Sequence, residues 1–360
     1  MRAVLMARPE SGAAEFTHDH PVPHPGPGEV RVLVVNTAIC GTDRHIFHWD
    51  DSIAGTMRTP VVIGHEFCGF VEELGEGVSG WEGGDYVSAE MHRVCGRCRA
   101  CQAGNQHVCE ETEIVGLHAD GAFAESVVVP AANLVRLDPE VVPPHVGAFL
   151  DALGNATHTV QAATGIEGRH VMITGYGAIG AMAAAVVAFE GAASITITEI
   201  QPGHLARART WAEGQDRGVP VRIHDATRTD LVEAVRDETE GGVDCVLEMS
   251  GAPPAINLGL DLLYPGGDIV LLGIPSASDL TLQEFSPRVI FKGLTLRGVV
   301  GRRMFSTWEK MLEMLGAGLD VEHIVTHRLP LEGFFDGIAL LDAGEAHKVV
   351  LDPRMEDTAS

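Results

Sequence analysis

The sequence predicts a two-domain α/β protein in which a β-rich part precedes a parallel sheet with crossover helices. The chain has 360 residues, more than a single small core usually organises. Short apolar runs separated by glycine and proline fill the first 150 residues, whereas strand and helix patterns alternate from about residue 154. Hydrophobic residues make up 45% of the chain, which is enough to form both cores.

The individual elements follow from apolar runs of strand or helix length that end at turn residues. In the β-rich part, strands are predicted at Val30 to Val35, Val61 to Ile63, Tyr86 to Ser88 and Phe123 to Val129. Later strands are predicted at 170–174, 194–199, 243–249 and 268–273, with helices in the Ala-rich stretch to Phe189, over 204–214 and over 254–263. The last sixty residues contain a predicted helix at 307–315 and a closing strand at 348–351.

Hydropathy argues against a membrane segment or a secretion signal. The longest apolar run, Ala181 to Phe189, has about half of the roughly 20 residues that a membrane span needs, and Glu190 ends it. This run predicts a buried helix. The N-terminus lacks an apolar core of roughly 7 to 15 residues, so secretion is not expected. Seven cysteines, four of them at metal spacing, favour a reducing cytoplasm.

The charge is strongly acidic, with 50 Asp and Glu against 25 Lys and Arg and only three lysines, for a net charge of −25. Nucleic acid is excluded as a partner, because binding a phosphate backbone requires a basic face. The favoured interpretation is adaptation to high salt, where screening removes most of the self-repulsion. The alternative is an acidic protein from a GC-rich genome in which Arg replaces Lys.

Four cysteines within fifteen residues form the most informative motif, CGRCRACQAGNQHVC. Four thiolates at this spacing suit Zn²⁺ or an iron–sulfur cluster. Because all four ligands come from the protein, the site has no open position for a substrate. The ligands are Cys95, Cys98, Cys101 and Cys109, whereas Cys68 and Cys245 lie in apolar sequence and are predicted to be core residues.

A glycine turn predicts a dinucleotide site. Gly175, Gly177 and Gly180 form GYGAIG directly after a predicted strand and before a helix, and Glu199 closes the next strand. The glycines permit a tight turn, close approach of a pyrophosphate and helix packing, while the helix N-terminus attracts the phosphates. Glu199 would accept hydrogen bonds from the ribose hydroxyls and repel a 2′-phosphate, which favours NAD over NADP. The alternative is an ordinary glycine-rich turn of an α/β sheet.

A second set of candidate metal ligands lies outside the cysteine motif. Cys40 occurs in CGTDRH, His65 and Glu66 in GHEFCG, and Asp151 in LDALGNATHT. A thiolate, an imidazole and carboxylates from separate loops are typical of an open zinc site with room for water or substrate. Considered alone, each residue also fits an ordinary structural role, the cysteine as a small buried side chain and the others as surface or helix-capping residues.

Together these motifs resemble the zinc-dependent medium-chain dehydrogenases over essentially the whole chain. The resemblance implies a GroES-like β-rich catalytic domain over 1–153 and 298–360, a structural-zinc lobe at about 92–112, and a Rossmann nucleotide-binding domain over 154–297. Within this family the chain most resembles the members that oxidise L-threonine. That closer resemblance is carried by the segments at 40–50, 153–159, 248–255, 289–294, 301–311 and 318–328.

The resemblance also implies the roles of individual residues. Cys40, His65 and Asp151 match the catalytic zinc ligands. Glu66 matches a catalytic residue that lies next to this metal and ligates it in some states of such enzymes, and the four cysteines match a structural zinc site. The remaining matches are Thr42 and His45 for a proton relay, His92 and Arg302 for substrate selection, and Gly175, Gly177, Ala178, Ile179, Gly180, Glu199, His204, Gly273 and Ile274 for the cofactor.

Two departures from the family pattern bear on these roles. Ala152 replaces a proline after the acidic ligand, which affects loop rigidity more than chemistry. His204 stands where an arginine is typical, after an unusual Pro202 and Gly203. This departure counts against the expected adenosine contact and, to a lesser degree, against the expected preference for NAD.

The implied activity is oxidation of L-threonine to 2-amino-3-oxobutanoate, with two zinc ions per subunit, NAD as hydride acceptor and a cytoplasmic homotetramer. One alternative is an NAD(P)-dependent zinc dehydrogenase of another polyol, butanediol or sugar. An alternative of a different class is a regulatory relative without catalysis, but Cys40, His65 and the nucleotide glycines are all present.

Overall fold

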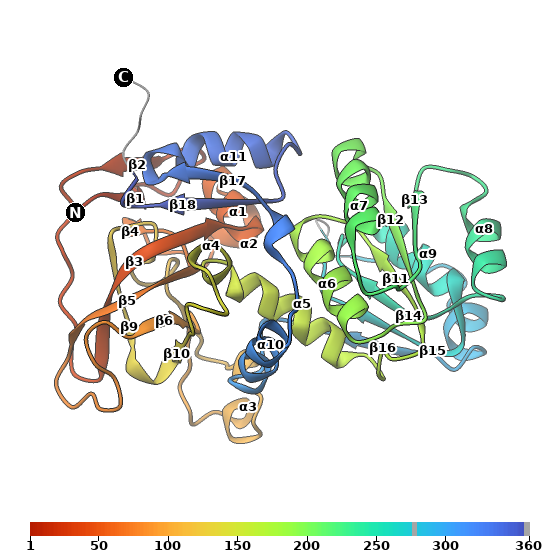
Figure 1. Ribbon diagram of the computed structural model, residues 1–360, viewed down its shortest axis with the longest axis horizontal. Coiled ribbons are helices and arrows are strands. Elements are labelled where there is room, and N and C mark those ends of the chain that lie inside the picture. The colour runs from red at the N-terminus through yellow and green to blue at the C-terminus, as the bar shows by residue number, and fades with distance from the viewer. Residues whose placement is uncertain (276–278, 356–360) are drawn as a thin grey trace. The chain divides into compact units, whose positions relative to one another are not determined.

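The computed structural model describes residues 1–275 and 279–355 (Figure 1). The chain divides into two compact units. The first comprises Met1–Ala152, Arg303–Trp308 and Val325–Ser360, and the second comprises Leu153–Arg302 and Glu309–Ile324. Each unit has its own sheet and apolar core, so each is described separately.

The first unit is built on a seven-stranded sheet with the order β10-β6-β5-β3-β18-β17, in which β9 also pairs with β3. Its strands are β3 (Glu29–Ile39), β5 (Phe67–Leu74), β6 (Tyr86–Ala89), β9 (Ser126–Pro130), β10 (Leu134–Arg136), β17 (Val325–Pro330) and β18 (Lys348–Asp352). The pairs are antiparallel except β17 with β18. The central strand β3 therefore connects the parts of this unit, and its carboxyl end lies at Cys40.

Smaller elements surround this sheet. A three-stranded sheet has the order β2-β1-β4, and β7 pairs with β8 in a separate ribbon. These strands are β1 (Ala3–Met6), β2 (Ala14–Thr17), β4 (Val61–Val62), β7 (His92–Arg93) and β8 (Glu113–Ile114). The helices are α1 (Gly41–His48), α2 (Asp51–Ala54), α3 (Arg99–Gln102), α4 (Pro144–Gly147) and α11 (Phe334–Asp342), with 3-10 turns η1 (Gln106–Val108), η2 (Ala131–Asn133) and η5 (Leu331–Gly333).

The second unit is a doubly wound parallel sheet with the order β13-β12-β11-β14-β15-β16. Its strands are β11 (His170–Thr174), β12 (Ser194–Glu199), β13 (Val221–Asp225), β14 (Val243–Glu248), β15 (Leu263–Leu271) and β16 (Thr295–Gly298). Because β11 pairs with both β12 and β14, the strand order reverses at β11, where such sheets bind ligands beyond their carboxyl ends.

The helices of this unit are α6 (Ala178–Phe189), α7 (Pro202–Gly214), α8 (Leu231–Glu238) and α9 (Pro253–Leu262), with short turns η3 (Ser286–Ile290) and η4 (Glu322–Ile324). Two further helices, α5 (Leu150–Ala162) and α10 (Ser306–Gly316), begin in the first unit and continue in the second. Residues 181 to 188 of α6 are all buried, which confirms that the longest apolar run is a core helix. Among the described residues, no helix has the length and apolarity needed to span a membrane.

The predicted fold class is confirmed, and the element boundaries show where sequence patterns were insufficient. The strands at 170–174 and 194–199 match β11 and β12. The prediction for 268–273 was wrong at its start, because β15 begins at Leu263, before a Pro-Gly-Gly sequence. The Phe123 run was also predicted too long, since β9 begins at Ser126. The strand β13 was missed because its sequence, VRIHD, mixes polar and apolar residues.

Steric contacts in the glycine turn require glycine at position 180. A Cβ on Gly180 would lie 2.1 Å from the carbonyl oxygen of Gly175, whereas a Cβ on Gly177 would meet nothing within 4 Å. We therefore expect Gly180→Ala to lower the free energy of unfolding of the second unit by about 1–3 kcal/mol, because the helix must move away from the strand. Urea unfolding measures this change. Gly177→Ala is the matched control, and equal unfolding midpoints for the two variants would contradict the prediction.

Candidate metal centres and dinucleotide site

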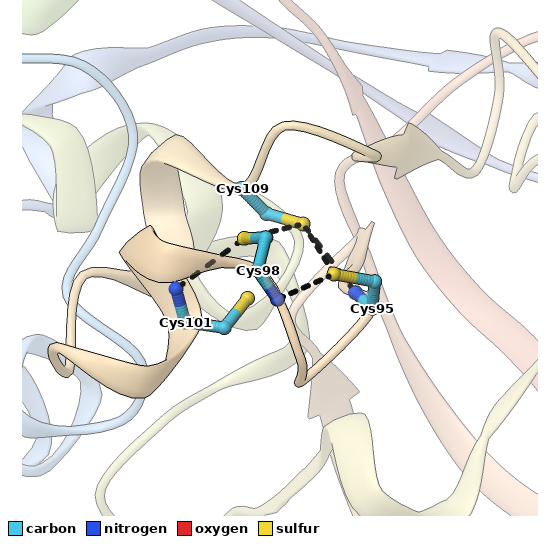
Figure 2. Close-up of side chains that lie close together, drawn as sticks. All are labelled: Cys95, Cys98, Cys101 and Cys109. Carbon is cyan, nitrogen blue, oxygen red and sulfur yellow. Dashed lines mark hydrogen bonds between the residues drawn. The ribbon is translucent and has the colours of Figure 1, made fainter.

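Four cysteine side chains converge in the first unit (Figure 2). Cys95 follows β7, Cys98 caps the N-terminus of α3, Cys101 lies within α3 and Cys109 follows η1. Their Sγ atoms lie within 4.8 Å of one another, and Cys109 Sγ is 3.5 Å from Cys95 Sγ and 3.9 Å from Cys98 Sγ. Ligands at about 2.3 Å from a tetrahedral Zn²⁺ lie about 3.8 Å apart, so the spacing fits one zinc ion.

Backbone N–H groups donate hydrogen bonds to these sulfurs and so favour their thiolate form, which binds a cation. The N–H groups of Cys98, Cys95 and Cys101 donate to neighbouring cysteine Sγ atoms at 3.3, 3.4 and 3.5 Å. Hydrogen bonds from the backbone of Cys101 and Glu110 lower the pKa of the Cys98 thiol to about 6, which favours the thiolate that metals bind. The separations exceed the about 2.05 Å of a disulfide. They are also too short for a cluster of several irons, so the zinc alternative fits better.

The second metal group begins where β3 ends. Cys40 is the N-cap residue of α1, with an extended backbone, and its Sγ accepts a hydrogen bond from the N–H of Thr42 at 3.2 Å. The Asp43 carboxylate accepts a hydrogen bond from the N–H of Cys40 at 2.9 Å, which completes a capping box. The helix start therefore fixes the direction of the Cys40 thiol.

His65 lies between Cys40 and Asp43. Its Nε2 is 2.9 Å from Cys40 Sγ, and its Nδ1 is 3.6 Å from Asp43 Oδ1. The carboxylate thus lies behind the imidazole at ion-pair distance, beyond hydrogen-bond range. The ligand atoms of Cys40, Asp43 and His65 lie within 4.8 Å of one another, as do those of His65, Glu66 and Asp151.

The electrostatics of this group fit a divalent cation. Burial raises the pKa of the Cys40 thiol, because the thiolate loses its hydration. Burial by itself lowers the pKa of His65, but the charges of Cys40 and Asp43 hold it well above its ordinary value. Anionic groups therefore surround the imidazole, and the donor set of thiolate, imidazole and carboxylate suits zinc.

The glycine turn leads to the N-terminus of α6. Gly177 is its N-cap residue, and the helix begins at Ala178 and Ile179, whose N–H groups precede the helical hydrogen-bond ladder. Such a terminus attracts phosphate groups. The other predicted cofactor residues, Gly273 and Ile274, follow β15. A Cβ on Gly273 would lie 2.0 Å from the amide nitrogen of Gly251, so only glycine fits there.

Glu199 ends β12 beside this turn. Its carboxylate accepts hydrogen bonds from the backbone N–H groups of Tyr176 at 2.7 Å, Ile200 at 2.6 Å and Gln201 at 2.8 Å. The Nδ1 of His204 lies 3.4 Å from the same carboxylate. Although burial raises the pKa of Glu199, the hydrogen bonds from His204 and these backbone groups lower it to about 2. A permanent negative charge therefore occupies this position.

Comparisons with known families match these sites. The family described as "Alcohol dehydrogenase GroES-like domain" matches residues 26–139, and "Zinc-binding dehydrogenase" matches residues 178–317. The chain belongs to the zinc-dependent alcohol dehydrogenases. The predicted combination of a GroES-like part with a Rossmann-type sheet is thereby confirmed, and zinc and a nicotinamide dinucleotide are the cofactors of this dehydrogenase.

The dehydrogenase is similar to several known proteins over nearly its full length. It is 42% identical to an L-threonine 3-dehydrogenase of Deinococcus deserti over 350 residues, which cover 96% of this chain and 98% of the relative. It is 40% identical to an enzyme of the same name from Rhizobium rhizogenes over 98% of both chains. A solved zinc-binding dehydrogenase of Sinorhizobium meliloti, bound to NADP, is 29% identical with a TM-score of 0.87, covering 98% of this chain and 99% of its own.

The remaining predicted site residues occupy diverse environments. Thr42 and His45 both lie on α1, where Thr42 is half-buried and His45 is exposed with its Nδ1 bonded to Asp50. The Nδ1 of His92 lies 2.5 Å from the carboxylate of Glu90, which is buried. Arg302 is buried in the second unit, where its Nη1 donates to Asn155 at 3.3 Å.

Four polar residues around these sites were not predicted from the sequence. Asp43 backs His65, Glu90 contacts His92, Lys348 donates to Glu66, and Glu248 accepts from Ser250 and Gly251 beside the nucleotide turn. The capping-box spacing of CGTD was a usable signal for Asp43. Glu90 contacts His92 only two residues further along, whereas Lys348 lies 282 residues from Glu66, so local spacing could have suggested the first pair but not the second.

The two metal groups should respond differently to loss of a ligand. We expect Cys98→Ser to lose one zinc ion and to lower thermal stability, because that ion organises a loop with little apolar core of its own. Cys40→Ser should also lose one zinc ion but keep its unfolding temperature and lose turnover by about 100-fold or more. Metal analysis, thermal unfolding and rate assays measure the three quantities. A Cys98→Ser protein of normal stability that lost only turnover would contradict this assignment.

Proposed function

We propose that this dehydrogenase oxidises the secondary alcohol of L-threonine to 2-amino-3-oxobutanoate, with hydride transfer to NAD. The observation that carries the proposal is the match of about 40% identity, over nearly the whole of both chains, with proteins named L-threonine 3-dehydrogenase. The gathered ligand set in the first unit supports it, because alcohol oxidation needs a Lewis acid.

In this proposal, Cys40, His65 and Asp151 hold the catalytic zinc, Glu66 lies beside it, and Cys95, Cys98, Cys101 and Cys109 hold a structural zinc. The catalytic zinc would lower the pKa of the substrate hydroxyl so that it ionises near neutral pH. The Nε2 of His65 faces Cys40, and the negative charge of Asp43 lies behind the imidazole.

We further propose that Thr42 and His45 carry the alcohol proton outward. Thr42 follows the ligand Cys40 by two residues, and His45 lies one helical turn further along α1. Asp50 engages the Nδ1 of His45, and the side chain is 57% exposed, so its imidazole can exchange a proton with solvent. An imidazole can both accept and donate a proton, which suits this role.

The cofactor residues are proposed to be Gly175, Gly177, Ala178, Ile179, Gly180, Glu199, His204, Gly273 and Ile274. The charged carboxylate of Glu199 favours NAD, because it accepts from ribose hydroxyls and repels a 2′-phosphate. His204 replaces the typical arginine and contacts Glu199, so it leaves that acidic environment in place.

His92 and Arg302 are proposed to distinguish an amino acid from a plain alcohol. The substrate carries an ammonium and a carboxylate, and a site that bonds such groups rejects analogues lacking them. Glu90 lies 2.5 Å from the Nδ1 of His92 and so orients its imidazole. Arg302 supplies a fixed positive charge that would match a carboxylate.

We propose that residues 1–153 and 298–360 form the catalytic domain and residues 154–297 the nucleotide-binding domain. We also propose that the protein is a cytoplasmic homotetramer that acts in threonine degradation. Free thiols at metal spacing need a reducing compartment. For assembly, the edge strand β16 is exposed at all four residues, and Ile290, Phe291 and Val300 near it are 58%, 81% and 53% exposed. An apolar edge of this kind favours contact between copies.

The acidic surface is proposed to be an adaptation to high salt. We expect the free energy of unfolding and the activity to rise as KCl is raised from about 0.1 M to about 2 M, because screening relieves the repulsion of a chain with net charge −25. Denaturant unfolding and rate assays at both salt concentrations measure this effect. Equal stability and activity at low salt would contradict it.

The substrate proposal is tested by NADH production with L-threonine against a panel of polyols, butanediols and sugars. We expect threonine to be preferred, and NAD to exceed NADP in kcat/KM by about tenfold or more, because Glu199 repels the extra phosphate. No turnover of threonine would refute the substrate. A tenfold preference for NADP would refute the role of Glu199, and faster turnover of a polyol would favour the alternative dehydrogenase.

A further inference from the structure

Glu248, the last residue of β14, has a fully buried carboxylate among the segments of the proposed dinucleotide site. Its side chain accepts hydrogen bonds from four donor groups. These are the hydroxyl of Thr174 at 3.1 Å, the N–H of Ser250 at 2.9 Å, the N–H of Gly251 at 3.0 Å and the hydroxyl of Ser250. A carboxylate only accepts hydrogen bonds, so this set of donors suits it.

The four donors lie on two separate segments around the glycine turn. Thr174 ends β11 and directly precedes Gly175, the first glycine of the turn, whereas Ser250 and Gly251 follow β14. A Cβ on Gly175 would lie 3.0 Å from the Cβ of Ser250. The two segments are therefore in close contact, and the side chain of Glu248 bonds to both.

A third segment, the turn after β15, packs against the same residue. The carbonyl oxygen of Glu248 accepts a hydrogen bond from the N–H of Gly273 at 3.1 Å. A Cβ on Gly273 would lie 2.7 Å from Glu248 Oε2, and a Cβ on Gly251 would lie 2.4 Å from the carbonyl oxygen of Ile274. Glu248 thus contacts all three segments that contain the proposed cofactor residues Gly175, Gly273 and Ile274.

These segments lie at the carboxyl edge of the parallel sheet, where the strand order reverses, because β11 pairs with both β12 and β14. Ligands of such sheets bind beyond this edge. A buried carboxylate with four donors resists rearrangement, since a donor that left it would have no water as a replacement partner. The segments are therefore held in place before a dinucleotide binds.

We propose that Glu248 is a positioning residue for the dinucleotide, which keeps the segments at 174–175, 250–251 and 273–274 in the arrangement that binds the cofactor. This inference rests on the proposed cofactor roles of Gly175, Gly273 and Ile274. Because the protein encloses its carboxylate, Glu248 acts through these segments and not by contact with the cofactor.

The experiment compares NADH titrations of the native protein and Glu248→Gln. Glutamine keeps the size of the side chain but replaces one oxygen by an NH₂ group, a donor that cannot accept from the N–H of Gly251. We expect the Kd for NADH to rise by about tenfold. The KM for NAD should rise likewise, while kcat at saturating NAD should fall by no more than about twofold. An unchanged Kd would overturn the inference.

Asp268→Asn is the matched control. Asp268 is a buried carboxylate of the same unit, and it accepts from Arg169 Nη2 at 2.6 Å and from the N–H of Thr164 at 3.1 Å. Both donors precede β11 and so lie away from the carboxyl edge of the sheet. Both substitutions should lower the urea unfolding midpoint, but Asp268→Asn should change the Kd for NADH by less than about twofold. Equal rises in Kd would show a general loss of packing and would overturn the role of Glu248.

Thr174→Val is a second variant, which tests the inference even if Glu248→Gln does not fold. Valine has nearly the shape of threonine but no hydroxyl, so Glu248 Oε1 loses one donor and no new donor faces it. We expect the Kd for NADH to rise by about threefold or more. An unchanged Kd would overturn the inference, because the glycine turn would then not depend on Glu248.

Gly273→Ala separates this inference from the proposed dinucleotide site. Its Cβ would lie 2.0 Å from the amide nitrogen of Gly251, so the variant must displace the turn after β15. If Gly273→Ala binds NADH as the native protein does, the proposed cofactor segments are wrong and the inference falls with them. If Gly273→Ala weakens NADH binding and Glu248→Gln does not, only the role of Glu248 is wrong.

Discussion

The burial of negative charge at the end of β3 is the constraint on which the first unit depends. Asp43 and Glu66 are 0% and 1% exposed, and the Cys40 thiol lies beside them. Carboxylates removed from water destabilise a fold unless cations or hydrogen bonds compensate them. The start of α1, the imidazole of His65 and the ammonium of Lys348 supply that compensation from within the protein.

The sequence predicted the features whose determinants are local. Four cysteines within fifteen residues must place their sulfurs together whatever the rest of the chain does, and the glycine turn is specified by a strand, three glycines and a helix. The Cys40, His65 and Asp151 set was different, because its members come from separate segments. Composition and spacing left that set open, and the resemblance to a family was what joined its members. The structure gathers Cys40 with His65 in one group and His65 with Asp151 in another.

Lys348 shows why contacts between distant residues could not be predicted from the sequence. It lies 282 residues from Glu66, in a strand whose letters, KVVL, indicate only a β-strand with a charged first residue. Exposed lysines are the rule, so nothing local predicted its burial. The fold brings the two together because β18 pairs with β3, a long-range pairing that no local pattern encodes. Glu248 was missed for the same reason, since it bonds to Thr174 on a neighbouring strand.

The carboxylate of Glu199 is already surrounded by hydrogen-bond donors of the protein. A carboxylate offers about four acceptor positions, and here three backbone amides and His204 already occupy them. The contact with His204, at 3.4 Å, is the longest of the four and comes from a side chain that can rotate. In the proposed site, ribose hydroxyls that bind to Glu199 would displace this contact first, because the backbone amides are held by the chain. The carboxylate is already oriented, so reordering on binding would fall on one imidazole rather than on the loop.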